Sequence, residues 1–261
     1  MENFIKKFAN WLNGFGINIF ILYRGLKGFP LLIGDYFQFI QRKPKEPFPI
    51  KFNYPCPADR YDTSGVASGH YFHQDLLVAR RIFEQNPQKH IDIGSRIDGF
   101  VAHVASFREI EVLDIRPIKN KVENIIFRQF DLTNPTSNFQ SCTDSLSCLH
   151  TLEHIGLGRY GDTIATDGYL IGLETLYSIL RSNGTLYLSV PIGPQRIEFN
   201  AHRVFSLRTI LDIIKDKFTL KNFSYVDDAG DIHENISLSE KDIDTSFDCW
   251  YGCGIFELQK K

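Results

Sequence analysis

The sequence lacks an excess of charge, a dense cysteine pattern and a long apolar run. Its 29 basic and 31 acidic residues give a formal net charge of -2, so no overall positive field attracts nucleic acid, and we expect no nucleic-acid partner. Five cysteines without dense spacing argue against a secreted disulfide framework and indicate a reducing compartment, so we expect a cytoplasmic protein. The nearest cysteine pair, Cys249 and Cys253, is interpreted as part of a strand and a turn rather than as a metal-binding pair.

Residues 1–60 are predicted to form a helical and linker extension, and residues 61–261 the main domain. No charged residue stands between Lys7 and Arg24, but this stretch is short for a bilayer span and has no signal-peptide cleavage site. Two interpretations stay open. Residues 1–40 form helices that pack on the main domain or on a second subunit of a homodimer, or they lie on an anionic membrane surface, with basic residues flanking an aromatic helix. Three prolines in 42–49 indicate a linker.

After residue 87, short apolar strands alternate with helical patterns. This alternation predicts an α/β domain with a mostly parallel sheet that is covered on both faces. An amphipathic helix precedes the first strand and ends near Asn86-Pro87. The expected strands are 90–93, 111–113, 125–130, 145–150, 185–190, 218–225 and 254–258, and the expected later helices are 100–107, 169–181 and 207–215.

The first strand leads into a glycine-containing turn that is followed by a helix. A turn of this kind lets the backbone approach a ligand without a Cβ between them. We predict that this loop holds a cofactor through Asp92, Gly94, Ser95, Arg96 and Gly99.

Two further aspartates extend this predicted cofactor site. Asp114 lies about twenty residues after Gly94, at the end of the second strand, where a carboxylate can bind both ribose hydroxyls of an adenosine. Asp131 ends the third strand and could reach the adenine amine. The alternative for each is a local turn, before Pro117 for Asp114 and an Asx turn for Asp131. Because the loop lacks the three-glycine dinucleotide fingerprint, we predict S-adenosyl-L-methionine (SAM) as the cofactor rather than NAD.

Residues 150–155, His-Thr-Leu-Glu-His-Ile, follow an apolar strand. Here the chain resembles the class I SAM-dependent methyltransferases, whose fourth strand runs into a segment of the type His-x-Leu-Glu-His-Ile beside the cofactor. Residues 173–186 are similar to that family's helix-to-strand junction, with Ser182-Asn183-Gly184 in place of its Leu-x-Pro-Gly-Gly motif. The resemblance covers 87–195. It implies a Rossmann-like, seven-stranded, mostly parallel sheet with an antiparallel last strand, and SAM bound near His150.

A closer resemblance runs from Gly69 to the C-terminus. Residues 69–75, 92–96, 152–162 and 200–205 resemble motifs of a small bacterial family of unknown function, whose members look like methyltransferases and tend to be encoded beside surface-polysaccharide genes. This resemblance implies methyl transfer to a sugar of a surface polysaccharide or of its precursor, with a small-molecule or glycan acceptor.

Methyl transfer to a hydroxyl needs an in-line acceptor and a base, because the sulfonium is already activated. Histidine titrates near neutral pH, so the candidate catalytic residues are His150, His154 and His202. The candidate acceptor-binding residues are His73, Gln74, Glu153 and Arg203.

Two other functions stay open. A chain that keeps this fold without catalysis could serve as a scaffold or partner of glycan-assembly enzymes. The spacing of His150, Glu153 and His154 also matches the helical zinc motif of a metalloprotease class and would suit a zinc-dependent hydrolase. Gly156 and Gly158 would stop such a helix almost at once. For the methyltransferase we predict no metal ligands.

Overall fold

The structure is a computed structural model that describes residues 8–9, 11–42, 48–134 and 139–261. The chain divides into two compact units, Met1–Val66 and Ala67–Lys261. Most of the predicted linker 42–49, and residues 1–7 of the predicted membrane-contacting segment, lie outside the described residues.

The first unit is built around helix α2, Ile19–Gln41. The side chain of Asn18 caps it by accepting hydrogen bonds from the backbone amides of Phe20 and Ile21, both at 3.0 Å, which satisfies donors that have no partner within the helix. A later segment returns along the helix through the short helix η1, Asp59–Tyr61. There Asp62 pairs with Arg24 at 2.6 Å. No helix in the described residues has both the length and the apolar character of a membrane span.

The second unit contains an eight-stranded sheet in the order β3-β2-β1-β4-β5-β10-β8-β9. The first five strands in this order are parallel, and β10 pairs antiparallel with both β5 and β8. This is the predicted methyltransferase-type sheet with an antiparallel last strand. The eighth strand, β9, was not predicted, because two residues leave no sequence pattern. The strands are β1 His90–Ile93, β2 Ile110–Asp114, β3 Ile125–Gln129, β4 Thr143–Leu149, β5 Leu180–Ile192, β8 Phe218–Val226, β9 Ile232–His233 and β10 Gly252–Lys260.

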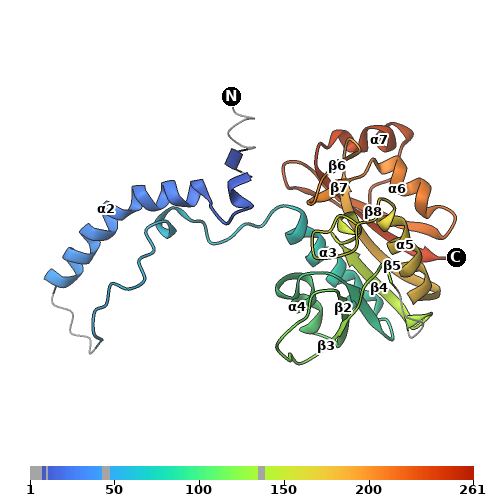
Figure 1. Ribbon diagram of the computed structural model, residues 1–261, viewed down its shortest axis with the longest axis horizontal. Helices are drawn as coiled ribbons and strands as arrows, with labels where there is room; N and C mark the ends of the chain where they lie inside the picture. The colour runs from blue at the N-terminus through green and yellow to red at the C-terminus, as the bar shows by residue number, and fades with distance from the viewer. Residues whose placement is uncertain (1–7, 10, 43–47, 135–138) are drawn as a thin grey trace. The chain divides into compact units, whose positions relative to one another are not determined.

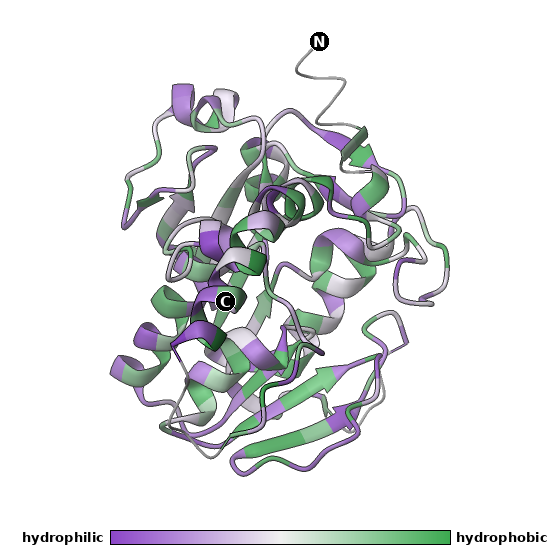
Figure 2. Cartoon of the chain, turned by 90° about the vertical axis from the view of Figure 1, so that its left-hand side faces the viewer, coloured by the Kyte–Doolittle hydropathy of each residue, from purple (hydrophilic) through white to green (hydrophobic). Residues whose placement is uncertain are grey.

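Helices cover both faces of the sheet, as the apolar strands predict (Figure 1). Successive strand residues point to opposite faces of the sheet. Val112 packs in the hydrophobic cluster under α3 and α4, and Leu113 packs in the cluster under α5 and α6. Figure 2 shows the hydrophobic colouring of strands within this unit. The helices are α3 His70–Gln85, η2 Ile97–Val101, α4 Ala102–Ala105, η4 Leu152–His154, α5 Gly168–Ile179, α6 Leu207–Ile214, α7 Glu240–Thr245 and η5 Ser246–Asp248, and β6 Arg196–Glu198 and β7 His202–Val204 form a separate hairpin.

Two predicted helix boundaries were wrong. The helix predicted over 100–107 begins earlier, as the π-helical turn η2, and Gly99 within it has non-helical dihedral angles, φ -124° and ψ -114°. The helix predicted over 169–181 ends at Ile179, and β5 starts at Leu180 instead of 185. Pairing of Leu180 with Thr143 of β4 extends the strand, so tertiary pairing overrides the local helical pattern.

Candidate functional site

The carboxyl ends of β1, β2 and β4 meet at a pocket, here called the strand-end pocket. Parallel strands place their carboxyl ends at one edge of a sheet, where open α/β folds bind ligands. The lining of this pocket includes Gly94, Asp114, Asp131, His150, His154 and Tyr160. It therefore brings together five of the residues predicted from the sequence to form a cofactor or catalytic site.

Gly94 gives the loop after β1 its close packing. Its φ is +74°, and a Cβ at this position would lie 2.6 Å from Cγ2 of Thr151. A larger residue would therefore clash and would also need a left-handed conformation that L-residues rarely adopt. The amide of Gly94 donates to the carbonyl of Leu113 at 3.0 Å, which ties the loop to β2.

Asp92 lies behind this loop rather than in the pocket lining. Its buried carboxylate accepts hydrogen bonds from the backbone amide of Ser95 at 3.0 Å, from the Ser95 hydroxyl at 2.7 Å and from the Ser147 hydroxyl at 2.5 Å. Burial raises the pKa of Asp92 to about 6, although these hydrogen bonds oppose the shift. The geometry gives Asp92 and Ser95 a direct part in shaping the loop.

Arg96 and Gly99 also lie outside the pocket lining. Arg96 is exposed and pairs with Asp98 at 2.8 Å. A Cβ on Gly99 would lie 2.8 Å from a carboxylate oxygen of Asp75. Gly99 thus allows the loop to approach α3 closely.

Asp114 and Asp131 both line the pocket, and both carboxylates already have partners. Asp114 accepts two hydrogen bonds from the Arg116 guanidinium, at 2.6 and 3.0 Å, and one from the Arg116 backbone amide at 2.8 Å, which is the local turn considered as its alternative. The Arg116 guanidinium also lies 4.5 Å from the centroid of the Tyr160 ring, so this side chain spans part of the pocket. Asp131 accepts from the amide and the hydroxyl of Thr133, at 2.8 and 2.7 Å, which is the Asx turn considered as its alternative.

His150 lies at the centre of the arrangement. Its φ is +49°, and its amide donates to the Ser189 hydroxyl at 3.0 Å. Nδ1 lies 2.7 Å from Oε1 of Glu153, whereas Nε2 is buried without a hydrogen-bond partner. The fold therefore orients this ring fully and leaves one nitrogen unpaired.

The helical zinc motif considered for His150, Glu153 and His154 is wrong. These residues lie on a loop and on the three-residue 3-10 helix η4, not on one long helix. Both imidazoles face Oε1 of Glu153, at 2.7 and 3.7 Å, and Nδ1 of His154 lies 2.6 Å from the carbonyl of Ala201. The glycines after η4 prevent the helix that the motif requires.

A second pocket, here called the α3 pocket, lies at the start of α3. It is lined by residues that include His70, Tyr71, His150, Asp228, Trp250 and Tyr251. Asp228 accepts hydrogen bonds from the amides of Trp250 and Tyr251, at 2.7 and 2.8 Å, and so positions this aromatic wall. His150 belongs to both pockets.

His202 lies close to this wall, with its ring centroid 5.0 Å from that of Tyr251 and 6.4 Å from that of His154. Burial lowers the pKa of His154 and of His202 below the usual histidine value. Both rings are therefore neutral at neutral pH and can accept a proton.

None of the four predicted acceptor-binding residues lines either pocket. Arg203 donates to the carbonyl of Ile155 at 2.6 Å and holds the loop after η4. Gln74 is buried and accepts from the Ser189 hydroxyl at 2.6 Å. Glu153 is buried against His150, and His73 is half-buried on α3.

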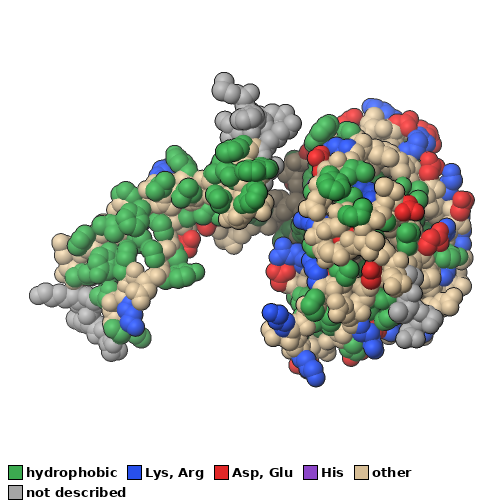
Figure 3. Space-filling model, in the orientation of Figure 1, with side chains coloured by type: hydrophobic (Ala, Val, Ile, Leu, Met, Phe, Trp, Pro, Cys, Tyr) green, Lys and Arg blue, Asp and Glu red, His purple; other side chains and the backbone are tan. Residues whose placement is uncertain are grey.

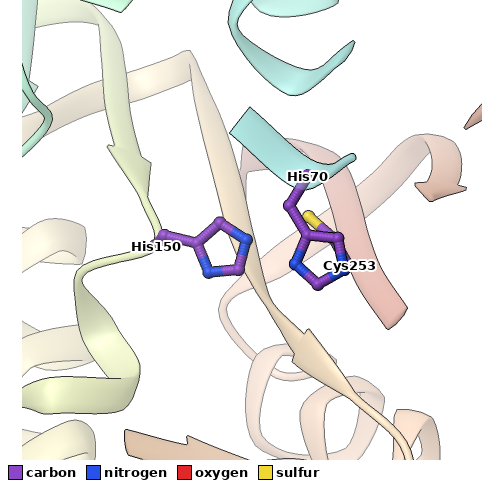
Figure 4. A group of neighbouring side chains, drawn as sticks. All are labelled: His70, His150 and Cys253. Atoms are coloured by element: carbon purple, nitrogen blue, oxygen red, sulfur yellow. The ribbon is translucent and has the colours of Figure 1, made fainter. Parts of the chain in front are cut away.

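The fold also unites residues that the sequence analysis did not connect. His70, His150 and Cys253 place one ligand atom each within 4.8 Å of one another, and they are the one such group of metal-binding residue types in the described residues (Figure 4). His70 begins α3 and Cys253 lies in β10. Their long separation along the chain left no local motif that could have linked them.

Solved structures with a similar fold include several methyltransferases. The N-methyltransferase NodS from Bradyrhizobium japonicum, in complex with S-adenosyl-L-homocysteine, is 10% identical, with a TM-score of 0.48 over 74% of this chain and 88% of that chain. A 1,6-didemethyltoxoflavin-N1-methyltransferase from Burkholderia thailandensis is 13% identical, with a TM-score of 0.49 over 72% and 78%. A TehB-like SAM-dependent methyltransferase from Corynebacterium glutamicum is 14% identical, with a TM-score of 0.47 over 70% and 86%.

No curated protein matches the sequence significantly. Residues 100–244, more than half of the chain, match the family DUF268, which is described as a Caenorhabditis protein of unknown function. The chain therefore belongs to the DUF268 family.

Proposed function

We propose that this protein is a SAM-dependent methyltransferase that binds SAM in the strand-end pocket and its acceptor in the α3 pocket. The observation that carries the proposal is the position of His150, which lines both pockets. Methyl transfer needs the two substrates to meet in line across one boundary. A residue shared by two pockets marks such a boundary.

The strand-end pocket suits an adenosine-containing cofactor. Asp114, at the end of β2, can accept hydrogen bonds from the ribose hydroxyls, and Asp131, after β3, can reach the adenine amine. Because Arg116 holds Asp114 from one side, the ribose would share this carboxylate with the guanidinium. Asp92 and Ser95 would act indirectly, by holding the loop that contains Gly94.

The α3 pocket suits a ring that bears hydroxyl groups. Its wall contains the aromatic side chains of Tyr71, Trp250 and Tyr251, which offer flat faces and two phenolic hydroxyls. We infer that the acceptor is a sugar of a surface polysaccharide or of its precursor. His202, neutral and close to Tyr251, would receive the hydroxyl proton, while His150 holds the boundary between the pockets.

Calorimetric titration of the full chain with S-adenosylhomocysteine tests the cofactor site, with NAD as the ligand control. We expect micromolar binding, and Asp114→Ala should weaken it about tenfold or more, because hydrogen bonds to a charged group contribute roughly 1.5–3 kcal/mol. Asp98→Ala is the matched control, since that aspartate is exposed and outside the pocket. Failure of the folded chain to bind, or equal binding by the Asp114 variant, would sink this proposal.

A non-catalytic scaffold is the second candidate. The bridge from Arg116 to Asp114, with the guanidinium lying against Tyr160, favours it, because the chain's own side chain then takes the place where a ribose would bind. A scaffold of glycan-assembly enzymes would bind neither S-adenosylhomocysteine nor SAM. The same titration therefore separates the two candidates.

We also propose that α2 contacts an anionic membrane surface on the cytoplasmic side. Its apolar side chains are largely exposed, with Leu22 at 58% and Leu26 at 68%. Figure 3 shows hydrophobic side chains over much of the visible face of this unit. The alternative occupants of this surface are the main domain or a second copy of the chain. Flotation with anionic vesicles, compared between the wild type and a variant that carries Leu22→Glu and Leu26→Glu, tests the membrane contact.

A further inference from the structure

We propose that His70, His150 and Cys253 bind a zinc ion, with one coordination position open to the α3 pocket. The three residues come from the start of α3, the loop after β4 and strand β10. His70 and His150 also line the α3 pocket. Zinc binding at this site goes beyond the proposed methyl transfer and does not depend on it.

The hydrogen bonds of His70 and His150 show which ring nitrogen of each is already used and which is free to bind a metal ion. A carboxylate accepts only, so Nδ1 of His150 donates its hydrogen to Glu153, at 2.7 Å, and Nε2 is the nitrogen that carries the lone pair in the neutral ring. By the same argument, Nε2 of His70 donates to the carbonyl of Tyr251, at 3.1 Å, and Nδ1 keeps its lone pair. Nε2 of His150 and Nδ1 of His70 are therefore the nitrogens that can bind a metal ion when the rings are neutral.

The two free nitrogens lie on the neighbouring edges of two stacked rings. Figure 4 shows one ring nitrogen of each histidine turned toward the other ring, with the sulfur of Cys253 close to His70. The ring planes are within 3° of parallel, with centroids 5.2 Å apart. Nε2 of His150 is buried and has no hydrogen-bond partner. A buried ring nitrogen without a partner is unfavourable unless a proton or a metal ion occupies the place beside it.

Cys253 completes a set of three ligands. Its buried sulfur has weak contacts, 3.8 Å to Oε1 of Gln74 and 3.9 Å to the carbonyl of Gly254. The three ligand atoms lie within 4.8 Å of one another, whereas Zn–N bonds of about 2.0–2.1 Å and Zn–S bonds of about 2.3 Å place tetrahedral ligands about 3.3–3.8 Å apart. Zinc binding therefore requires the three side chains to move closer together, and His70 is the one of the three that is only half-buried.

The chemistry of the ligands favours zinc. Two imidazoles and one thiolate form a borderline-soft set that suits Zn²⁺. Each histidine also has an outer partner, Glu153 or the Tyr251 carbonyl, of the kind that orients zinc-bound histidines. Three protein ligands leave a fourth position for water or a substrate, as in catalytic zinc sites.

A zinc ion at this site could activate the hydroxyl group of the acceptor for methyl transfer. This activation, unlike zinc binding itself, rests on the proposed function. A hydroxyl at the open position would have a lower pKa. Its proton passes to His202, and its oxygen forms a bond to the methyl carbon. The carbon–sulfur bond of SAM breaks at the same time and leaves its electron pair on sulfur. The products are the methyl ether and S-adenosylhomocysteine.

Metal analysis of the full chain after zinc loading and removal of excess metal tests the site. We expect about one zinc per chain, bound with three protein ligands. Replacement with Co²⁺ should give the sulfur-to-cobalt absorption of a thiolate ligand. His70→Ala and Cys253→Ser should each weaken zinc binding about tenfold or more, because ligand losses exceed the cost of losing an outer partner. Cys249→Ser and His103→Ala, which keep all three ligands, should bind zinc as the wild type does.

Circular dichroism verifies that each variant is folded. Less than about a tenth of an equivalent of zinc on the folded wild type would overturn the site, since structural and catalytic zinc binds far more tightly. Unchanged zinc binding in both ligand variants would overturn it as well. Titration of the same samples with S-adenosylhomocysteine keeps the two proposals apart: zinc without the nucleoside refutes methyl transfer alone, and the nucleoside without zinc refutes the metal site alone.

Discussion

Helices α2 and α3 differ in burial in the opposite sense to their apolar content: α2 is the more apolar helix, yet Gly28 is its one buried residue, whereas one side of α3 is buried. In α3, Leu77, Val78 and Ile82 lie on one side of the helix and are buried against the sheet. In α2 the consecutive residues 20–23 are all exposed and apolar or aromatic. Consecutive helical residues point about 100° apart, so these four side chains spread around the helix, and a flat surface can cover only those on one side. The arrangement of apolar residues, and not their number, decides which helix becomes part of a core.

Replacement of Arg81, on the buried side of α3, is expected to have the largest effect on the free energy of unfolding. It pairs with Glu257 of β10 at 3.2 Å, and both side chains are 9% exposed. Arg81→Ala should lower the free energy of unfolding by about 3–5 kcal/mol, because it removes the charged partner of a buried carboxylate and leaves it only the neutral donors Gln85 and Asn222. Arg60→Ala, which removes an exposed pair with Asp35 in the first unit, should cost no more than about 1 kcal/mol. Urea unfolding followed by circular dichroism measures both, and equal costs would contradict the expectation.

Ile82 of α3 and Leu22 of α2 allow a buried and an exposed apolar side chain to be compared directly. Its side chain is fully buried in the cluster of α3 and α4. Ile82→Ala should cost about 2–5 kcal/mol, through lost burial and the cavity left behind. Leu22→Ala on α2 should change the unfolding free energy by less than about 0.5 kcal/mol, because its side chain is exposed. A large loss for Leu22 would mean that α2 is covered in solution.

Asp75 on α3 should make the stability of the main domain depend on pH. Burial raises the pKa of Asp75 to about 6, against the hydrogen bond from Gln74. The folded chain therefore holds this proton more tightly than the unfolded chain. The resulting stability is complete below about pH 4 and is lost as the pH rises through about 6, with a contribution of about 1–3 kcal/mol.

Unfolding measured between pH 4 and 7 tests this expectation. Asp75→Asn, which cannot ionise, should flatten the part of the profile that Asp75 causes and should be more stable than the wild type at pH 7. Asp62→Asn alters an exposed carboxylate of the first unit and should keep the wild-type profile. An unchanged profile in Asp75→Asn would remove Asp75 as its source.

The exposed face of α2 gives the smallest effect on stability and the clearest effect on membrane binding. Leu22→Glu with Leu26→Glu should change the free energy of unfolding by less than about 1 kcal/mol. The same pair should weaken flotation with phosphatidylglycerol vesicles about tenfold or more, since each buried leucine contributes roughly 1.5–3 kcal/mol. Leu76→Glu with Phe83→Glu, two exposed positions of α3, is the matched control. Equal flotation of both variants and the wild type would exclude membrane contact through α2.

Much of the fold could be predicted from local patterns. Short apolar strands such as 90–93, the glycine turn at Gly94 and the capped helix from 207 are visible in sequence, because each depends on neighbouring residues. The end of α5 could not be predicted this way, since β4 draws Leu180 into a strand. The eighth strand is likewise formed by pairing with β8 rather than by its own two residues.

The candidate site likewise has some features that the sequence predicts and others that only tertiary packing sets. The sequence by itself determined that Gly94, Asp114, Asp131 and His150 follow strand ends, and parallel strands bring such ends to one edge. Only the tertiary structure decided that Asp92 lies behind the loop, that Arg116 holds Asp114, and that His70 and Cys253 lie beside His150. The physical reason is that periodicity and turn chemistry act over a few residues, whereas contacts between distant segments depend on how whole elements pack.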